Sequence, residues 1–257
     1  MTSCEKYDII PNKGAGGDCL ITSKPQVLRS EDLYCYIMQY LAINTGKVVT
    51  PSLITTTINK CLGFQFTTNK TVSNYLDKIC DAGLLYELDR EYISLSDKQP
   101  SKLSYNRTYY FANIDSFVKF YDYASKDLFK HKDINGLSYD IAIAKTLLYH
   151  RCVNAGYDVN SGVLSFYSHL EGGKTKKNTL SFDFILKNGE KETYVVFQND
   201  KDFDEVEFTI EAKFALQNII NKLSVVVVTT ASNFKPLEIE GFSYISLDEI
   251  LTDNFNI

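Results

Sequence analysis

The 257-residue sequence has little histidine and no closely spaced pair of cysteines. Its three histidines and six cysteines are scattered, so the usual spacing of zinc ligands is missing and a zinc site is not expected. No apolar run approaches the roughly 18 residues that a membrane-spanning helix needs, and no charged-then-apolar leader opens the chain. We therefore expect a cytoplasmic protein that has free thiols and no membrane partner.

Positive charge is not in excess either. The chain has 27 Lys and Arg against 32 Asp and Glu, a formal net charge of -5. This balance argues against an indiscriminate nucleic-acid binder, although a local basic patch is compatible with it. Residues 1–28 include the glycine-rich stretch PNKGAGGDC, but they lack the GxxxxGK[ST] pattern that cradles nucleotide phosphates. We expect residues 1–28 to form a flexible leader.

Three helical patterns and two strand patterns follow the leader. The helices are expected to begin at Ser30, at Thr50-Pro51 and in TNKTVSNYLDKICDAG, whose apolar residues recur at helical spacing. The segments LLYELDREYISL and SYNRTYYFAN are then expected to be strands. Three short helices before a two-stranded hairpin is the order of a winged helix-turn-helix, so residues 29–130 are predicted to be a winged-helix domain.

The third helix would be the recognition helix of such a domain. Small polar and basic residues are expected on its outer face and suit a DNA major groove: Lys70, Thr71, Ser73, Asn74 and Lys78. Acidic residues on the same helix, Asp77 and Asp81, offset the two lysines. Two interpretations follow: this face contacts DNA, or it is a solvated face of a module that docks a protein.

Residues 131–257 are predicted to form an α/β domain. A helix is expected at 114–123, before this domain, and helices are expected within it at 137–155 and 206–221, with short strands at 157–159 and 163–167. The segment SFDFILKNGEKETYVVFQND has an Asn-Gly turn between two apolar runs, which predicts a β-hairpin. The run SVVVV predicts a strand buried on both faces, and FSYISLDEIL a strand followed by a short helix.

A helix, a hairpin with Asp then Glu-x-Lys, a crossover helix and a buried strand form the restriction-endonuclease-like core. Its carboxylates hold magnesium, which activates water, while the lysine positions the nucleophile. Here Asp183 stands at the aspartate position, Gln198 replaces the glutamate, Asp200 replaces the lysine and Lys201 is displaced by one residue. These four are the candidate catalytic residues, with Asp183 as the candidate metal ligand, and together they predict a degenerate site. No cofactor is expected; magnesium or manganese would be needed if the site were active.

The sequence resembles the C-terminal region, of unknown function, that follows the ATPase module in many bacterial and archaeal AAA-type proteins. The resemblance is carried by TVSNYLDKICDAGLLYELDR, RTYYFANI, AGYDV, the hairpin, LSVVVVTT and GFSYISLDEIL, over about residues 30 to 257. It implies a winged helix plus a nuclease-like domain, here without the ATPase module, and a separate ATPase as a protein partner. Lys145 and Arg151 stand where the family commonly has two glutamates.

The fold class predicted is thus α+β and α/β: an N-terminal winged helix-turn-helix followed by a restriction-endonuclease-like mixed sheet flanked by helices. The function predicted is a non-catalytic DNA- or protein-binding module. The alternatives are a metal-dependent nuclease, which would need a further metal ligand such as Glu171 or Glu192, and a winged-helix transcriptional regulator. Three lysines in a loop before the hairpin are further candidates for phosphate contact: Lys174, Lys176 and Lys177.

Overall fold

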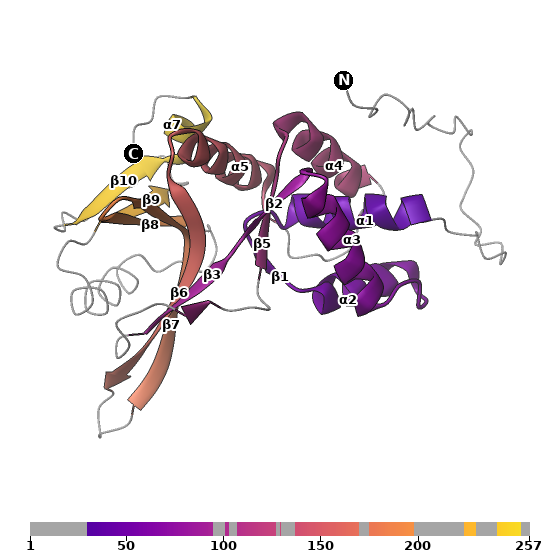
Figure 1. The fold of residues 1–257 in the computed structure, drawn as a ribbon, viewed down its shortest axis with the longest axis horizontal. Coiled ribbons are helices and arrows are strands. Elements are labelled where there is room, and N and C mark those ends of the chain that lie inside the picture. Colours follow the sequence, from indigo (N-terminus) through magenta and orange to yellow (C-terminus); the bar gives the residue numbers. More distant parts are fainter. Residues whose placement is uncertain are drawn as a thin grey trace.

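The fold is a mixed α/β arrangement of helices and two sheets (Figure 1). The structure is a computed structural model. It describes residues 30–94, 101–102, 107–126, 129, 137–169, 175–197, 224–229 and 241–252. The expected leader at 1–28 and the helix expected at 206–221 lie outside these ranges.

Helices α1 (Ser30–Ile43), α2 (Pro51–Leu62) and α3 (Asn69–Asp81) occupy the predicted positions. Helix α2 begins where Thr50 accepts a hydrogen bond from the Leu53 N–H at 3.2 Å, and it ends at Gly63, whose φ is 80°. Thr68 caps α3 in the same way. Local capping chemistry therefore explains why the sequence located these helices correctly.

The smaller sheet has the strand order β1-β5-β2 and is antiparallel, formed by β1 (Val48–Val49), β5 (Arg107–Phe111) and β2 (Leu85–Leu88). Helix α4 (Ile114–Lys126) follows β5. The fully buried Phe111 of β5 contacts Phe117 of α4 edge-on, with ring centroids 5.8 Å apart. Together with α1 to α3 this sheet makes the N-terminal part of the fold.

The larger sheet has seven strands, in the order β10-β9-β8-β7-β6-β3-β4. Their bounds are β3 (Arg90–Ser94), β4 (Ser101–Lys102), β6 (Asp158–His169), β7 (Thr175–Asn188), β8 (Lys191–Phe197), β9 (Val225–Thr229) and β10 (Phe242–Ser246). Neighbours are antiparallel except for the parallel pairs β3–β6, β8–β9 and β9–β10. All five residues of β9 are buried, which confirms the prediction made for SVVVV. Helices α5 (Tyr139–Asn154) and α7 (Leu247–Leu251) complete this part.

Two predictions about strands were wrong. LLYELDREYISL was expected to be one strand, but it divides at Asp89: β2 pairs with β5 in the small sheet, while β3 pairs with β6 in the large one. The reason is that the side chains of the two halves are buried in different hydrophobic clusters: Leu85 and Leu88 in one, and Ile93 in the other.

The two short strands expected at 157–159 and 163–167 form the single strand β6, whose register shifts between Asn160 and Gly162.

The β7–β8 hairpin forms as predicted at the Asn-Gly turn, where Gly189 has a φ of 63°.

At the other end of β7 the sheet narrows to two strands. Pairing of β3 to β6 stops at Ser165 and pairing of β8 to β7 starts at Phe184, whereas the β6–β7 ladder continues to the pair His169–Thr175. This part of β6 and β7 is a two-stranded ribbon that extends beyond the rest of the sheet (Figure 1).

The two parts of the fold share one core. Strands β3 and β4 precede residue 130, the predicted domain boundary, yet they belong to the larger sheet. Tyr110 of the small sheet is fully buried, stacks on Tyr149 of α5 at 4.7 Å and lies 5.4 Å from Phe184 of β7. One hydrophobic cluster therefore runs from α1 to α7 across that boundary.

Candidate functional site

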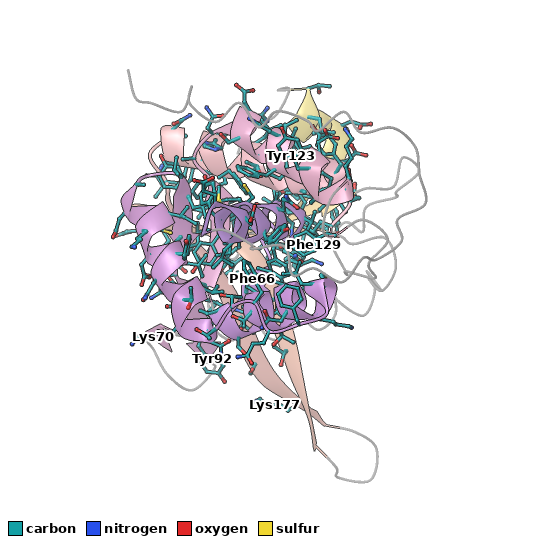
Figure 2. All side chains as sticks on the ribbon, turned by 90° about the vertical axis from the view of Figure 1, so that its right-hand side faces the viewer. Phe66, Lys70, Tyr92, Tyr123, Phe129 and Lys177 are labelled. Carbon is teal, nitrogen blue, oxygen red and sulfur yellow. The ribbon has the colours of Figure 1, made fainter. Side chains whose placement is uncertain are left out.

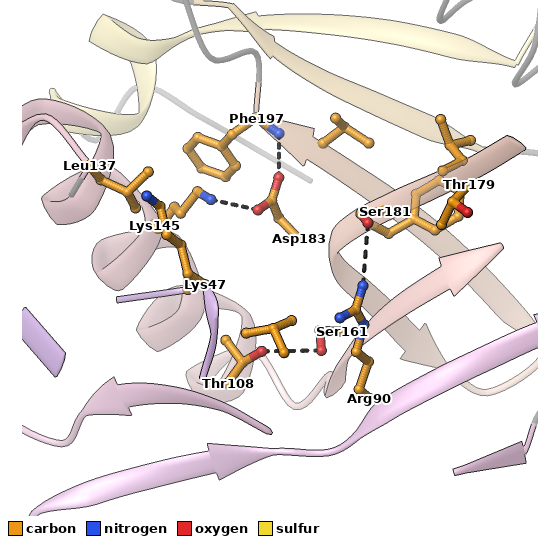
Figure 3. Close-up of a pocket in the computed structure, with 15 residues that line it drawn as sticks. Lys47, Arg90, Thr108, Leu137, Lys145, Ser161, Thr179, Ser181, Asp183 and Phe197 are labelled. Atoms are coloured by element: carbon orange, nitrogen blue, oxygen red, sulfur yellow. Dashed lines mark hydrogen bonds and ion pairs between the residues drawn. The ribbon is translucent and has the colours of Figure 1, made fainter. Parts of the chain in front are cut away.

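Asp183 lies on β7 and both of its carboxylate oxygens accept hydrogen bonds (Figure 3). Oδ1 accepts from Nζ of Lys145 at 2.5 Å, and Oδ2 accepts from the backbone N–H of Phe197 at 2.7 Å. The Lys145 side chain is 3% exposed and the Asp183 side chain 18%. The candidate metal ligand is thus one half of a largely buried ion pair.

Helix α5 and strand β8 together hold the Lys145 ammonium in place. Lys145 projects from the middle of α5, a helix of which half the residues are buried. Its Nζ lies 5.2 Å from the centroid of the Phe197 ring, so the charge is stabilised by a carboxylate and an aromatic face together. The Lys145 ammonium is therefore bonded to the one carboxylate that was predicted to hold a metal.

These residues do not fit a magnesium or manganese ion. Such ions need several oxygen ligands, usually with more than one carboxylate. Within the described residues, no group of three or more His, Cys, Asp or Glu side chains could hold a metal. A cation entering beside Asp183 would also have to displace the Lys145 ammonium against charge repulsion.

The other predicted catalytic residues, Gln198, Asp200 and Lys201, lie outside the described residues, as does Glu171. Glu192, the other residue considered as a further metal ligand, is at the start of β8, next to the hairpin turn. Its carboxylate accepts a hydrogen bond from the Tyr194 hydroxyl at 2.8 Å and lies 3.9 Å from Nζ of Lys187. Five residues of extended strand, about 16 Å, separate it from Phe197 and hence from the Asp183 carboxylate.

A pocket of about 420 Å³ opens around the ion pair (Figure 3). Its polar lining consists of three cationic side chains, one carboxylate and four hydroxyls: Lys47, Arg90, Lys145, Asp183, Thr108, Ser161, Thr179 and Ser181. Nη2 of Arg90 donates to Oγ of Ser181 at 3.3 Å. The Thr108 and Ser161 hydroxyl oxygens are 3.4 Å apart and connect the two sheets.

The electrostatics of the pocket follow from these charges. Burial lowers the pKa of Lys47, and the nearby positive charge of Lys145 lowers it further. Burial also lowers the pKa of Arg90. Both pKa shifts follow from the partial loss of hydration around these two cations in the folded protein.

The predicted recognition face of α3 is only partly available. Lys70, Asn74 and Lys78 are exposed and lie at i, i+4 and i+8, so they form one stripe along the helix. Ser73 is half-buried beside this stripe. The Thr71 hydroxyl lies 2.9 Å from that of Thr68 at the helix N-terminus, so Thr71 belongs to the cap.

The prediction of a loop was wrong for Lys176 and Lys177, which lie on strand β7 where it forms the β6–β7 ribbon. Lys177 is exposed, and alternation along β7 puts it on the same face as Thr179, Ser181 and Asp183 (Figure 2 labels Lys177). Lys176 is the next residue toward the tip of the ribbon, and Lys174 lies outside the described residues. Basic residues are therefore found on α3, on the ribbon and in the pocket.

Sequence reasoning missed Lys47 and Arg90. Lys47 lies just before β1, and Arg90 begins β3, where the chain crosses between the sheets. Neither belongs to a motif. Arg151, the other basic replacement noted in the sequence, lies in the last turn of α5 and does not line the pocket.

Comparison with known proteins leaves the family open. No family model matches the chain, and no curated protein matches it. Among solved structures, protein VC1899 from Vibrio cholerae matches with a TM-score of 0.26 and 13% sequence identity, over 87% of this chain and 55% of that one. The chain thus spans about half the length of that protein. The resemblance to the AAA-associated region stays a prediction.

Within the described part of the chain, no helix is long and apolar enough to cross a membrane.

Proposed function

We propose that this protein is a non-catalytic DNA-binding module, built from a winged helix and a nuclease-like sheet whose active site has been lost. The observation that carries the proposal is the Lys145–Asp183 ion pair. In a metal-dependent nuclease the equivalent carboxylate binds the ion that activates water and stabilises the developing charge on phosphorus. Here an internal ammonium and a backbone N–H use both oxygens of that carboxylate.

The exposed stripe of α3 supports DNA as the partner. Lys70 and Lys78 are eight residues apart, about 12 Å along the helix axis. An ammonium at each end of the stripe can reach phosphates on the two sides of a major groove while Asn74 faces the bases between them. Asp77 and Asp81 are exposed on the same helix and reduce the attraction. Binding is therefore expected to be weak at physiological salt and strong at low salt.

Binding without cleavage is the first expected result. Fluorescence anisotropy of a labelled duplex titrated with the protein should show salt-sensitive binding, and the same samples on a gel should contain intact DNA with magnesium or manganese present. Cleavage that requires manganese would overturn the proposal and would indicate a metal-dependent nuclease with Asp183 as a catalytic residue. Absence of binding at low salt would instead favour a protein partner.

The double substitution Lys70→Ala, Lys78→Ala tests the α3 stripe. It should weaken duplex binding for all sequences and reduce the slope of log K against log[salt] by about two, since each phosphate contact contributes about 0.9. The measurement is the same anisotropy titration at four or more salt concentrations.

The matched control is Lys119→Ala, Lys126→Ala, which removes two exposed lysines from α4. These lysines contact Tyr123 and Asp122 of their own helix. The control should bind like the unmodified protein. Equal losses in the two double variants would mean that net charge, and not the α3 stripe, sets the affinity.

A further inference from the structure

One face of the larger sheet is polar and reaches the surface where strands β3, β6 and β7 are neighbours. The opposite face of these strands carries Ile93, Leu164 and Phe182, which are buried in one hydrophobic cluster. Alternation along the strands puts a different set of side chains on the polar face, called here the β3–β6–β7 face. Those that reach the surface are half-buried or exposed: Arg90, Tyr92, Ser165, Lys177, Thr179 and Ser181.

A hydrogen bond and the strand register confirm that these side chains share one surface. Nη2 of Arg90 donates to Oγ of Ser181 at 3.3 Å, across the intervening strand β6. Tyr92 is opposite Val163, which is opposite Ser181, so the Tyr92 and Ser181 backbones are about 10 Å apart. Lys177 precedes Ser181 by four residues on β7, about 13 Å along the strand. Figure 2 shows Tyr92 and Lys177 in the same lower part of the molecule.

We propose that the β3–β6–β7 face binds a single strand of DNA. In this arrangement a base stacks on the Tyr92 ring, and Arg90 and Lys177 contact phosphates. The hydroxyls of Thr179 and Ser181, between the two cations, donate to phosphate or sugar oxygens.

Charge complementarity favours a polyanion as the partner. The described positions of this face on β3, on β6 and on residues 177–181 of β7 include no Asp or Glu. The next carboxylate along β7 is that of Asp183, which is bonded to Lys145. Arg90 donates to a hydroxyl, so its other N–H groups are available for phosphate oxygens.

The Tyr92 ring favours a single strand over a duplex. Tyr92 is half-buried, and within the described part of the chain no other aromatic ring contacts it. Proteins that bind single strands combine basic side chains with aromatic rings on which bases stack. The bases of a duplex are already paired and stacked on each other, so they do not offer a free face to the ring. The choice of DNA over RNA rests on the proposed function, because DNA is the partner inferred for α3.

Strand β3 holds Tyr92 in place from the opposite side of the sheet. Its neighbours in sequence, Glu91 and Ile93, are both buried. Glu91 accepts two hydrogen bonds from Nζ of Lys187, at 2.6 and 2.9 Å, which fixes β3 to β7. A backbone that is already ordered loses little conformational entropy when a base stacks on its side chain.

Fluorescence anisotropy with a labelled oligothymidylate tests the face. A length of about 10 nucleotides lies within the range of comparable sites, and such a strand cannot form a duplex with itself. The unmodified protein should bind it with an affinity that falls as salt is raised. Tyr92→Leu should weaken binding at least about fivefold, because leucine has no ring on which a base can stack. Tyr92→Phe keeps the ring and should bind like the unmodified protein.

The matched control for the ring is Tyr123→Leu. Tyr123 is a half-buried tyrosine of α4, with Nζ of Lys119 6.0 Å from its ring centroid, and it lies outside the β3–β6–β7 face. Its substitution should leave binding unchanged. For the phosphate contact, Lys177→Ala should lower the slope of log K against log[salt] by about 0.7, the contribution of one contact to a single strand. Lys191→Ala, at an exposed lysine beside the hairpin turn, should leave the slope unchanged.

A spectroscopic test detects stacking directly. The sequence has no tryptophan, so Tyr92→Trp introduces a single one into the face. Its emission should be quenched when the oligothymidylate binds, because the indole then stacks on a base. Tyr123→Trp, away from the face, should show no quenching.

Three outcomes overturn the proposal: no binding at low salt, equal losses in Tyr92→Leu and Tyr123→Leu, or an equally large loss in Lys70→Ala, Lys78→Ala, which would place the single strand on α3. Tighter binding of oligouridylate than of oligothymidylate, lost in Tyr92→Leu, would overturn the assignment to DNA. A thermal melt of each variant confirms that it is folded. If Tyr92→Leu unfolds, the quenching of Tyr92→Trp decides the test.

The face goes beyond the proposed function, and the two fail separately. If the oligothymidylate binds through Tyr92 but no duplex binds, the proposal for α3 is wrong and that for the face stands. If the α3 stripe binds duplex DNA while the oligothymidylate does not bind, the proposal for the face is wrong and that for α3 stands.

Discussion

Replacing Asp183 with alanine should lower the free energy of unfolding by about 3–5 kcal/mol. The substitution would leave the Lys145 ammonium buried with 3% of its side chain exposed and without its carboxylate. The Phe197 ring remains beside it, but a ring face is worth only about 1–2 kcal/mol. The measurement is equilibrium unfolding in urea, with the loss appearing as a lower midpoint at unchanged slope.

A double-mutant cycle separates this ion pair from simple loss of packing. Lys145→Met removes the charge but keeps an apolar chain of similar length, and the remaining Asp183 still accepts the Phe197 N–H and has 18% exposure. The variant with both substitutions should therefore be more stable than Asp183→Ala alone. A loss below about 1 kcal/mol in Asp183→Ala would mean that water solvates Lys145, and the ion pair would then no longer argue against a metal ion at Asp183.

Gly46→Ala should cost about 2–4 kcal/mol of unfolding free energy, the second large effect expected. The φ of Gly46 is +71°, a conformation that costs alanine about 1–2 kcal/mol. A Cβ there would lie 2.6 Å from Oη of Tyr110 and 2.9 Å from Cδ of Lys145. Tyr110 is fully buried and Lys145 nearly so, so neither can move away without disturbing the core, which typically adds about 1–3 kcal/mol.

Gly63→Ala is the control for the backbone part of that cost. Gly63 has a φ of +80° and nothing within 4 Å of an added Cβ. It should lose only the conformational cost of about 1–2 kcal/mol, measured by the same urea unfolding. Equal losses in the two variants would show that the Tyr110 and Lys145 side chains can move away from an added Cβ at Gly46 without a measurable cost in stability.

The sequence by itself determined the local elements. Threonine caps and left-handed glycines set the ends of α2 and α3, because those interactions involve residues only a few positions apart. The Asn-Gly turn specified the β7–β8 hairpin, and the all-valine run specified a strand buried on both faces.

Only the tertiary structure decided what these elements make together. The chain leaves one sheet and enters the other at Asp89, which no local propensity reports, because the pairing of β3 with β6 depends on partners about 70 residues away, such as Ser161 for Arg90. The Lys145–Asp183 bond joins residues 38 positions apart. The pocket beside Asp183 needs Lys47, Arg90 and Ser181 from three separate segments. Charges in a sequence indicate which residues can interact, but burial and distance, which decide the free energy of that interaction, exist only in the folded chain.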